Sequence, residues 1–234
     1  MKRLAIGFVV AGLLAGTSGT AVAQSQGWAM TPFAAYVQPS GNLVEGPFLD
    51  TDPSGGFVVG IIGELGLTKQ LAVSAFASST VGLSSTLTAT YKDPSNAANN
   101  SEFDFANAWT QLGGTAIIRP LGRLPNGAPK IFWLEAGAAI TRFSLADVQD
   151  RSGGTSLSWT GNFPSVVFGG GFTLRLTPRM TAVLFGRYSL ALSEYSSDGL
   201  DDWNSPCSPG DATCIDAGQK VNLLQVGVGF RSGR

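Results

Sequence analysis

Residues 165–192 read SVVFGGGFTLRLTPRMTAVLFGRYSLAL, and two properties of this stretch indicate the fold. Apolar residues alternate with small or polar residues along both halves, which is the period-two pattern of a β-strand with one apolar face. The halves are joined by Thr177-Pro178-Arg179, a segment with the composition of a turn. The stretch therefore predicts a hairpin of two strands, at about 162–176 and 180–192, with Arg175 and Arg187 on the face opposite the aliphatic side chains.

The same alternation recurs along the chain outside this hairpin. We expect eight strands, at about 29–38, 56–67, 71–83, 103–118, 130–145, 162–176, 180–192 and 220–231. Short connections at 68–70, 119–129 and 177–179 alternate with long polar connections at 39–55, 84–102, 146–161 and 193–219. Short turns on one side and long loops on the other are typical of an antiparallel up-and-down barrel.

Composition favours a barrel that lies in a membrane. Only 13% of the residues are charged, against about 25% in soluble domains, while 44% are hydrophobic. After residue 23 no apolar run approaches the roughly 20 residues of a membrane-spanning helix. A closed barrel is the remaining way to satisfy backbone hydrogen bonds in lipid. The predicted fold is therefore an all-β, eight-stranded, antiparallel up-and-down transmembrane β-barrel.

The first 23 residues have the three parts of a secretory signal peptide. Lys2 and Arg3 form a charged start, an apolar run follows, and Ala21-Val22-Ala23 matches a cleavage site. The alternative, an N-terminal membrane helix, is less favoured because the apolar run is too short to span. We expect residues 24–234 to form the barrel domain, with 13 basic and 16 acidic residues, a balance that does not indicate nucleic-acid binding.

Four charged residues fall on the inward face of the predicted barrel: Glu64, Glu135, Arg175 and Arg187. The interior of an eight-stranded barrel is just wide enough to be filled by side chains, so inward charges should be paired. We therefore predict a Glu/Arg charge network in the lumen. The alternative is that individual charges sit at water-exposed strand ends.

The chain contains no histidine, which argues against an enzyme. Ser-His-Asp triads, His general bases and His-ligated zinc are all excluded, and we expect no catalytic residue, cofactor or metal. Cys207 and Cys214 are the only cysteines, and in an exported protein they are expected to form a disulfide, with two free thiols as the alternative. The acidic segment 198–202 lacks the ordered spacing of a calcium loop.

Two segments resemble a known family. The hairpin from Phe168 to Ser189 resembles the penultimate hairpin of small bacterial outer-membrane β-barrels, of the OmpA membrane-domain, OmpX and OmpW types. The segment 224–230 is similar to their last strand, in which Val226, Val228 and Phe230 would act as the insertion signal read by the barrel-assembly machinery. The chain departs from the family in the four residues that follow Phe230. The resemblance implies the outer membrane, with both termini periplasmic.

We expect function to reside in the long loops. A structural or surface-interaction role, through an unidentified extracellular ligand, requires nothing beyond the predicted barrel. The alternative is a narrow, porin-like conduit or binding barrel for small apolar molecules, similar to OmpW, to which Ile62, Val183 and Phe185 on the inward face give limited support. Expected partners are outer-membrane lipid, lipopolysaccharide and the assembly machinery, with no nucleic acid.

Overall fold

A computed structural model describes residues 28–45, 49–82, 85–92, 96, 100–122, 124, 128, 130–145, 160–177, 180–193, 216–217 and 220–232. These residues form the strands β1 (Trp28–Ser40), β2 (Val44–Glu45), β3 (Leu49–Pro53), β4 (Gly56–Gly66), β5 (Leu71–Thr80), β6 (Ser85–Tyr91), β7 (Ser101–Ile118), β8 (Phe132–Leu145), β9 (Thr160–Arg175), β10 (Met180–Ala191), β11 (Asp216–Ala217) and β12 (Asn222–Ser232). Nowhere in these ranges does a helical segment combine the length and the hydrophobicity that a membrane crossing requires.

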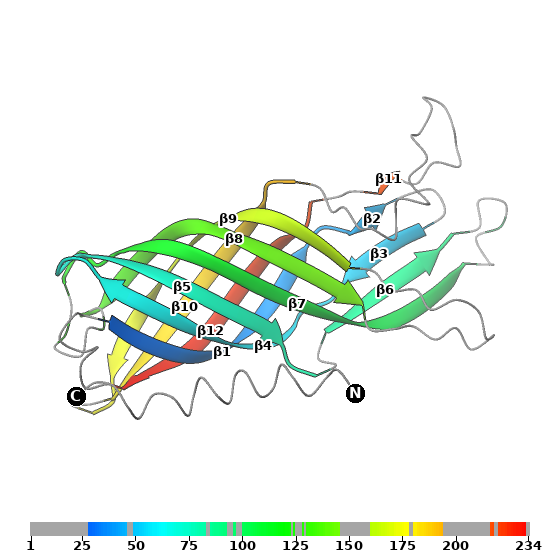
Figure 1. Cartoon of the computed structure of the whole chain (residues 1–234). Coiled ribbons are helices and arrows are strands. Elements are labelled where there is room, and N and C mark those ends of the chain that lie inside the picture. The colour runs from blue at the N-terminus through cyan, green and yellow to red at the C-terminus, as the bar shows by residue number, and fades with distance from the viewer. Residues whose placement is uncertain are drawn as a thin grey trace, which may run out of the picture.

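Eight of these strands close into an antiparallel barrel (Figure 1). The order around the wall is β1, β4, β5, β7, β8, β9, β10, β12, and β12 pairs with β1 from Phe33↔Gly229 to Ser40↔Asn222. Each barrel strand corresponds to one of the eight expected from the sequence. The predicted all-β, eight-stranded, antiparallel fold is therefore confirmed.

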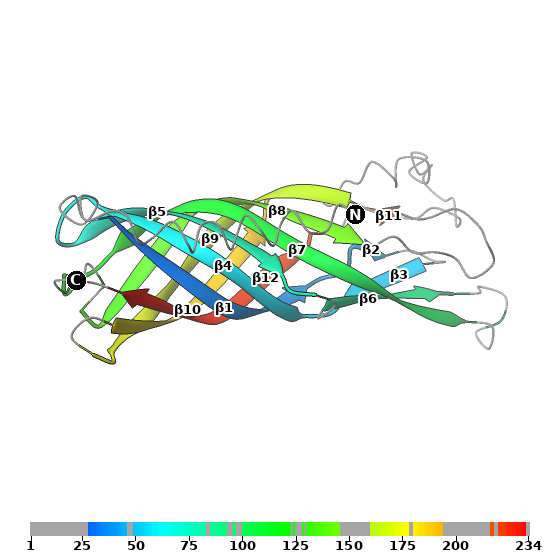
Figure 2. The same ribbon diagram turned by 60° about the horizontal axis from the view of Figure 1, so that its bottom comes forward.

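Two of the long connections expected from the sequence are not loops throughout. Within 39–55 and 84–102, β3 pairs with β6 and β6 pairs with the first part of β7, so the sheet continues beyond the barrel wall. Figures 1 and 2 show this extension, together with β2 and β11, at the end opposite the short turns. The sequence prediction missed it because β6 is short and has threonine at every second position, with Leu87 as its one large aliphatic residue.

Two of the short turns share one arrangement of hydrogen bonds. The Thr68 hydroxyl accepts the N–H of Leu71 at 2.9 Å, and the Thr177 hydroxyl accepts the N–H of Met180 at 2.9 Å. A threonine side chain that bonds a nearby backbone N–H stabilises a turn locally. The pattern Leu-Thr-x-x-Leu/Met therefore sets the tight connection in both hairpins.

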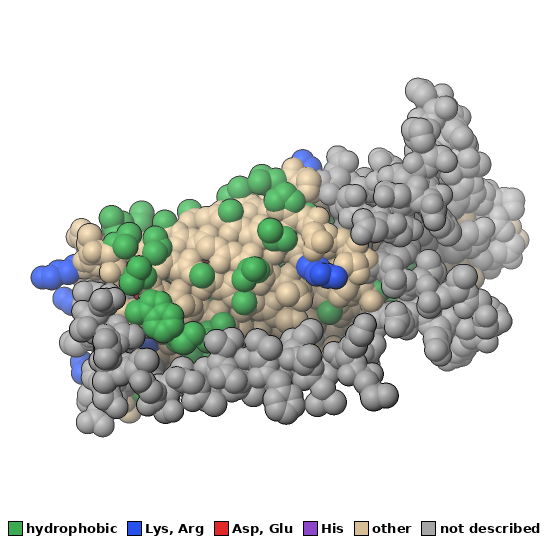
Figure 3. Space-filling model, viewed as in Figure 1, with side chains coloured by type: hydrophobic (Ala, Val, Ile, Leu, Met, Phe, Trp, Pro, Cys, Tyr) green, Lys and Arg blue, Asp and Glu red, His purple; other side chains and the backbone are tan. Residues whose placement is uncertain are grey.

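The outer surface of the wall is apolar. Along β8 the outward positions from Phe132 to Ile140 are all apolar, and this nine-residue span matches the roughly 9–11 residues of a membrane-crossing strand. Figure 3 shows hydrophobic side chains over the wall and Lys or Arg side chains toward its two ends. Other exposed apolar residues of the wall include Val59, Leu65, Val73, Leu112, Leu174, Leu184 and Val226.

The lumen is narrow enough that large inward side chains lie opposite glycines. Phe33 faces Gly60, Phe76 faces Gly113, and Phe185 faces Gly227 and Gly171 across neighbouring strands. A Cβ added at Gly60 would lie 2.4 Å from the Phe33 ring. These glycines therefore provide the space that inward aromatic rings occupy.

Replacing Gly171 with alanine should destabilise the barrel. The new Cβ would lie 2.2 Å from the Leu184 carbonyl oxygen, so the backbone of β10 must shift. We expect a loss of about 1–3 kcal/mol in the free energy of unfolding, measured by urea denaturation in detergent micelles. Gly186→Ala is the matched control, because a Cβ at Gly186 meets no atom within 4 Å. Equal stability of the two variants would contradict this account of the lumen.

Candidate functional site

The centre of the lumen holds a buried ion pair between Glu135 on β8 and Arg187 on β10. The Arg187 Nε and Nη2 groups donate to the two carboxylate oxygens of Glu135 at 2.7 and 3.2 Å. Both residues stand in register with Gly169 of the intervening β9 strand. A Cβ at Gly169 would lie 3.2 Å from Glu135 Oε1, so glycine leaves the two charged side chains room to meet.

Further polar and aromatic groups complete this central cluster. The Thr115 hydroxyl donates to Glu135 Oε2 at 2.9 Å, and Ser74 lies 2.7 Å from Thr115. The Arg187 guanidinium lies 3.9 Å from the centre of the Phe76 ring, a cation–π contact. Arg187 also donates to Gln225 at 3.4 Å. The ion pair is therefore satisfied on several sides, as a buried charge requires.

A second charge cluster lies in the lumen nearer the short turns. Glu64 on β4 accepts hydrogen bonds from Arg119, which follows β7, and from Arg231 on β12 at 3.2 and 3.3 Å. All three side chains are buried. The lumen charges thus form two clusters rather than the single network expected from the sequence.

Arg175 does not belong to either cluster, so its assignment to a lumen network is wrong. It is the last residue of β9, and its side chain is exposed. Residue alternation predicts the face of the strand on which a side chain lies, but it does not predict whether that side chain is inside the barrel or at its open end. Arg175 has the inward parity but lies at the rim, where water solvates its charge.

Arg119 and Arg231 are lumen residues that the sequence prediction did not include. The alternation of β12 places Arg231 on the face of the inward residue Gln225, but the predicted charge network left it out. Arg119 shares the parity of the inward residues Thr115 and Ile117 of β7, but it falls one residue beyond the predicted strand end at 118, directly before Pro120.

On the loop side of the central ion pair, a third polar layer crosses the lumen. The Gln111 side-chain amide donates to Thr141 at 3.1 Å and to Ser189 at 2.8 Å, which links β7, β8 and β10. All three residues are buried. The layer adds another set of side chains that fill the interior.

The loop-side end of the lumen is aromatic. The Trp109 ring lies 4.8 Å from the Phe143 ring and 6.4 Å from the Phe163 ring, measured between centroids. Trp109 Nε1 and both amide atoms of the buried Asn107 have no hydrogen-bond partner. Polar groups left unpaired in a buried environment are rare, and this layer contains three such atoms among the described residues.

The remaining predicted site residues divide into two groups. Val226 and Phe230 are exposed on the outer face of β12, and Val228 shares their face and is half-buried. Cys207, Cys214 and the predicted signal peptide lie outside the described residues. No group of three or more His, Cys, Asp or Glu residues is arranged to hold a metal ion within the described ranges.

Neutralising Glu135 should strongly destabilise the protein. Glu135→Gln leaves the Arg187 guanidinium buried without its counter-charge, and we expect a loss of about 3–5 kcal/mol in the free energy of unfolding. The measurement is the urea midpoint of the barrel in micelles. Arg175→Gln, which removes an exposed charge, is the control and should change stability by less than about 0.5 kcal/mol. Adding Arg187→Met to Glu135→Gln should recover much of the loss, and failure to recover would show that the pair is not the cause.

No family model and no curated protein matches the sequence of this chain. Solved structures do match its fold. The outer membrane protein OprG from Pseudomonas aeruginosa is 12% identical with a TM-score of 0.53, and the match covers 88% of this chain and 96% of OprG.

Two further solved structures match at lower TM-scores. Neisserial surface protein A is 15% identical with a TM-score of 0.46, covering 89% of this chain and 97% of that protein. Ail, the attachment invasion locus protein of Yersinia pestis, is 11% identical with a TM-score of 0.43, covering 87% and 98%. The closed eight-stranded wall and the similarity to OprG together show that this chain has the fold of the small bacterial outer-membrane β-barrels.

Proposed function

We propose that this chain is an integral outer-membrane barrel with a structural or surface-interaction role, carried by its loop-side end. The observation that carries the proposal is the filled lumen. The side chains of Arg119, Arg187 and Arg231 are among the largest fully buried groups of the described chain. A lumen crossed by ion pairs, a polar layer and an aromatic layer offers no continuous path for solutes.

The outer surface supports a location in the membrane. An apolar wall about nine residues high fits the hydrocarbon layer, whereas a soluble barrel such as a lipocalin would present polar side chains outward. We infer that the short turns face the periplasm and the extension formed by β3, β6 and β7 faces outward. Phospholipid, lipopolysaccharide and, through β12, the assembly machinery are the partners that this placement requires.

The extension gives the loop-side end a distinctive surface. Asp52, Thr88 and Asp104 lie in register across β3, β6 and β7, and the Thr88 hydroxyl donates to Asp104 at 2.7 Å. Glu102 is also exposed on β7. A polar, acidic sheet that projects from the wall is suited to contact with an extracellular ligand.

We also infer that the chain is not an enzyme. Without histidine, the carboxylates of Glu64 and Glu135 would be the lumen groups available for acid–base chemistry. Both accept hydrogen bonds from arginine side chains and are buried. Their arrangement therefore serves the packing of the lumen.

Planar-bilayer recording tests the filled lumen. We expect the purified, inserted wild-type barrel to pass little or no steady current, because the two charge clusters and the aromatic layer block the axis. Insertion is verified separately by a difference in gel mobility between unheated and boiled samples. A stable, voltage-independent conductance in the wild type would contradict the proposal and favour a conduit.

The aromatic layer supports a second candidate function, the binding of small apolar molecules at the loop-side end of the lumen. Such a guest would pack against Trp109, Phe143 and Phe163, and a hydroxyl group on it would pair with the Asn107 amide.

Thermal denaturation in the presence of medium-chain alcohols tests this second function. An alcohol that binds the folded barrel should raise the midpoint temperature of denaturation. Asn107→Leu removes the polar partner of the alcohol hydroxyl, so it should reduce the temperature shift caused by an alcohol more than the shift caused by an alkane of the same length. Thr88→Val, on the extension, is the control. No shift with any chain length would rule out this candidate.

A further inference from the structure

The short-turn end of the barrel exposes only positive charges among the described residues. Lys69, Lys130 and Arg175 are exposed there, and none of them forms an ion pair with another described residue. Thr173 N–H donates to the Ile131 carbonyl oxygen at 2.8 Å, which places the end of β9 beside the residue after Lys130. Lys130 and Arg175 therefore belong to one rim.

The acidic residues of the chain follow the opposite distribution. Glu64 and Glu135 are paired inside the lumen, and the other fourteen lie in the extension or in sequence segments that join loop-side strand ends. The sequence contains no Asp or Glu in 65–92, 105–134 or 151–193, the ranges that include the three short connections. The positive rim thus has no acidic counterpart in the turns themselves.

Apolar side chains accompany these cations. Leu67, Leu121, Ile131 and Leu174 are each about half exposed or more at the same end of the barrel. Lysine and arginine next to exposed leucines match a membrane interface, where the side-chain stem lies in the apolar layer and the charge reaches the headgroups. A water-soluble anionic partner would leave these leucines uncovered.

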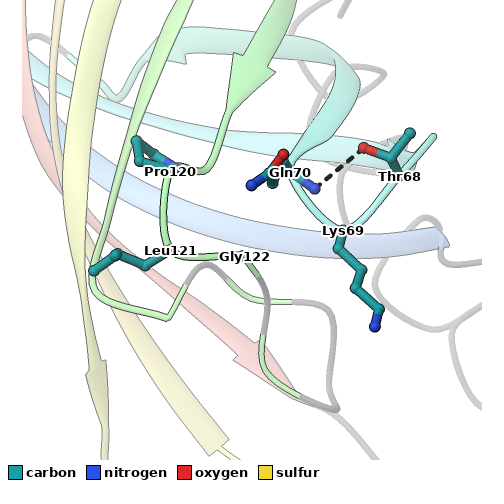
Figure 4. A pocket seen from close by; sticks show the side chains of 6 residues that line it. All are labelled: Thr68, Lys69, Gln70, Pro120, Leu121 and Gly122. Carbon is teal, nitrogen blue, oxygen red and sulfur yellow. Dashed lines mark hydrogen bonds between the residues drawn. The ribbon is translucent and has the colours of Figure 1, made fainter.

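One hollow brings the two features together (Figure 4). It has a volume of about 420 Å³ and lies between the β4–β5 turn and the segment after β7. The backbone N–H of Lys130 donates to the Gly122 carbonyl oxygen at 3.0 Å, which places the Lys130 backbone next to this hollow. The lining residues are Thr68, Lys69, Gln70, Pro120, Leu121 and Gly122.

We propose that the short-turn end is a contact surface for anionic phospholipid. The hollow takes the phosphate headgroup beside Lys69, while Lys130 and Arg175 add charge to the same rim and the exposed leucines meet the acyl chains. This inference rests on the membrane location in the proposed function and adds a lipid preference at one end of the barrel.

Electron spin resonance of spin-labelled lipids tests the preference. The barrel is inserted into phosphatidylcholine vesicles, and the association of labelled phosphatidylglycerol is compared with that of labelled phosphatidylcholine. In the wild type we expect phosphatidylglycerol to associate about five times more strongly than phosphatidylcholine, or more, because one interfacial cation contributes a factor of that size. This ratio should decrease when salt is added. The variant Lys69→Gln/Lys130→Gln/Arg175→Gln should bring the ratio to about one. The control Arg142→Gln removes an exposed cation near the loop-side end of β8 and should leave the ratio unchanged.

Several results would overturn the inference. A wild-type ratio near one, an unchanged ratio in the triple variant, or an equal loss in Arg142→Gln would each do so. Loss of the preference on adding inorganic phosphate at matched ionic strength would assign the hollow to a free anion instead. A barrel that fails to insert into vesicles would refute the proposed membrane location itself, whereas an inserted barrel without lipid preference refutes only this inference.

Discussion

The pairing of β12 with β1 is the interaction on which the rest of the structure depends. It joins the two ends of a sheet whose outer face is apolar, and only closure supplies every wall strand with two neighbours. Closure also determines the width of the interior. With eight strands that width accommodates side chains and little else, so the composition of the inward face follows from the strand count.

The narrow interior explains the pairing of large residues with glycine. Gly169 separates Glu135 from Arg187 and allows their side chains to meet, while Gly60 and Gly113 provide space for aromatic rings. Two charge clusters and a polar layer follow one another along the axis, and the Trp109 aromatic cluster fills the loop-side end. Filling the interior in this way favours a single packed state and leaves the two ends of the barrel as the surfaces available for contact.

The sequence predicted the wall better than it predicted the ends. Alternation identified all eight barrel strands and placed Glu64, Glu135 and Arg187 on the inward face, because lipid and lumen impose opposite requirements on successive residues. It misplaced Arg175, since parity carries no information about height along the axis. The extension escaped prediction because β6 is short and its residues are mostly threonine, serine and alanine, so it lacks the run of large apolar residues by which strands are recognised.

The continuity of β7 has a mechanical consequence. This strand runs unbroken for 18 residues through both the barrel wall and the extension, whereas the chain leaves regular pairing between β3 and β4 and between β5 and β6. A pulling force applied to the projecting sheet would therefore travel along β7 into its ladder with β8, where all the hydrogen bonds resist sliding together. Because this ladder is loaded in shear, the barrel wall would bear an external force on the extension, and the extension would resist detachment from the wall.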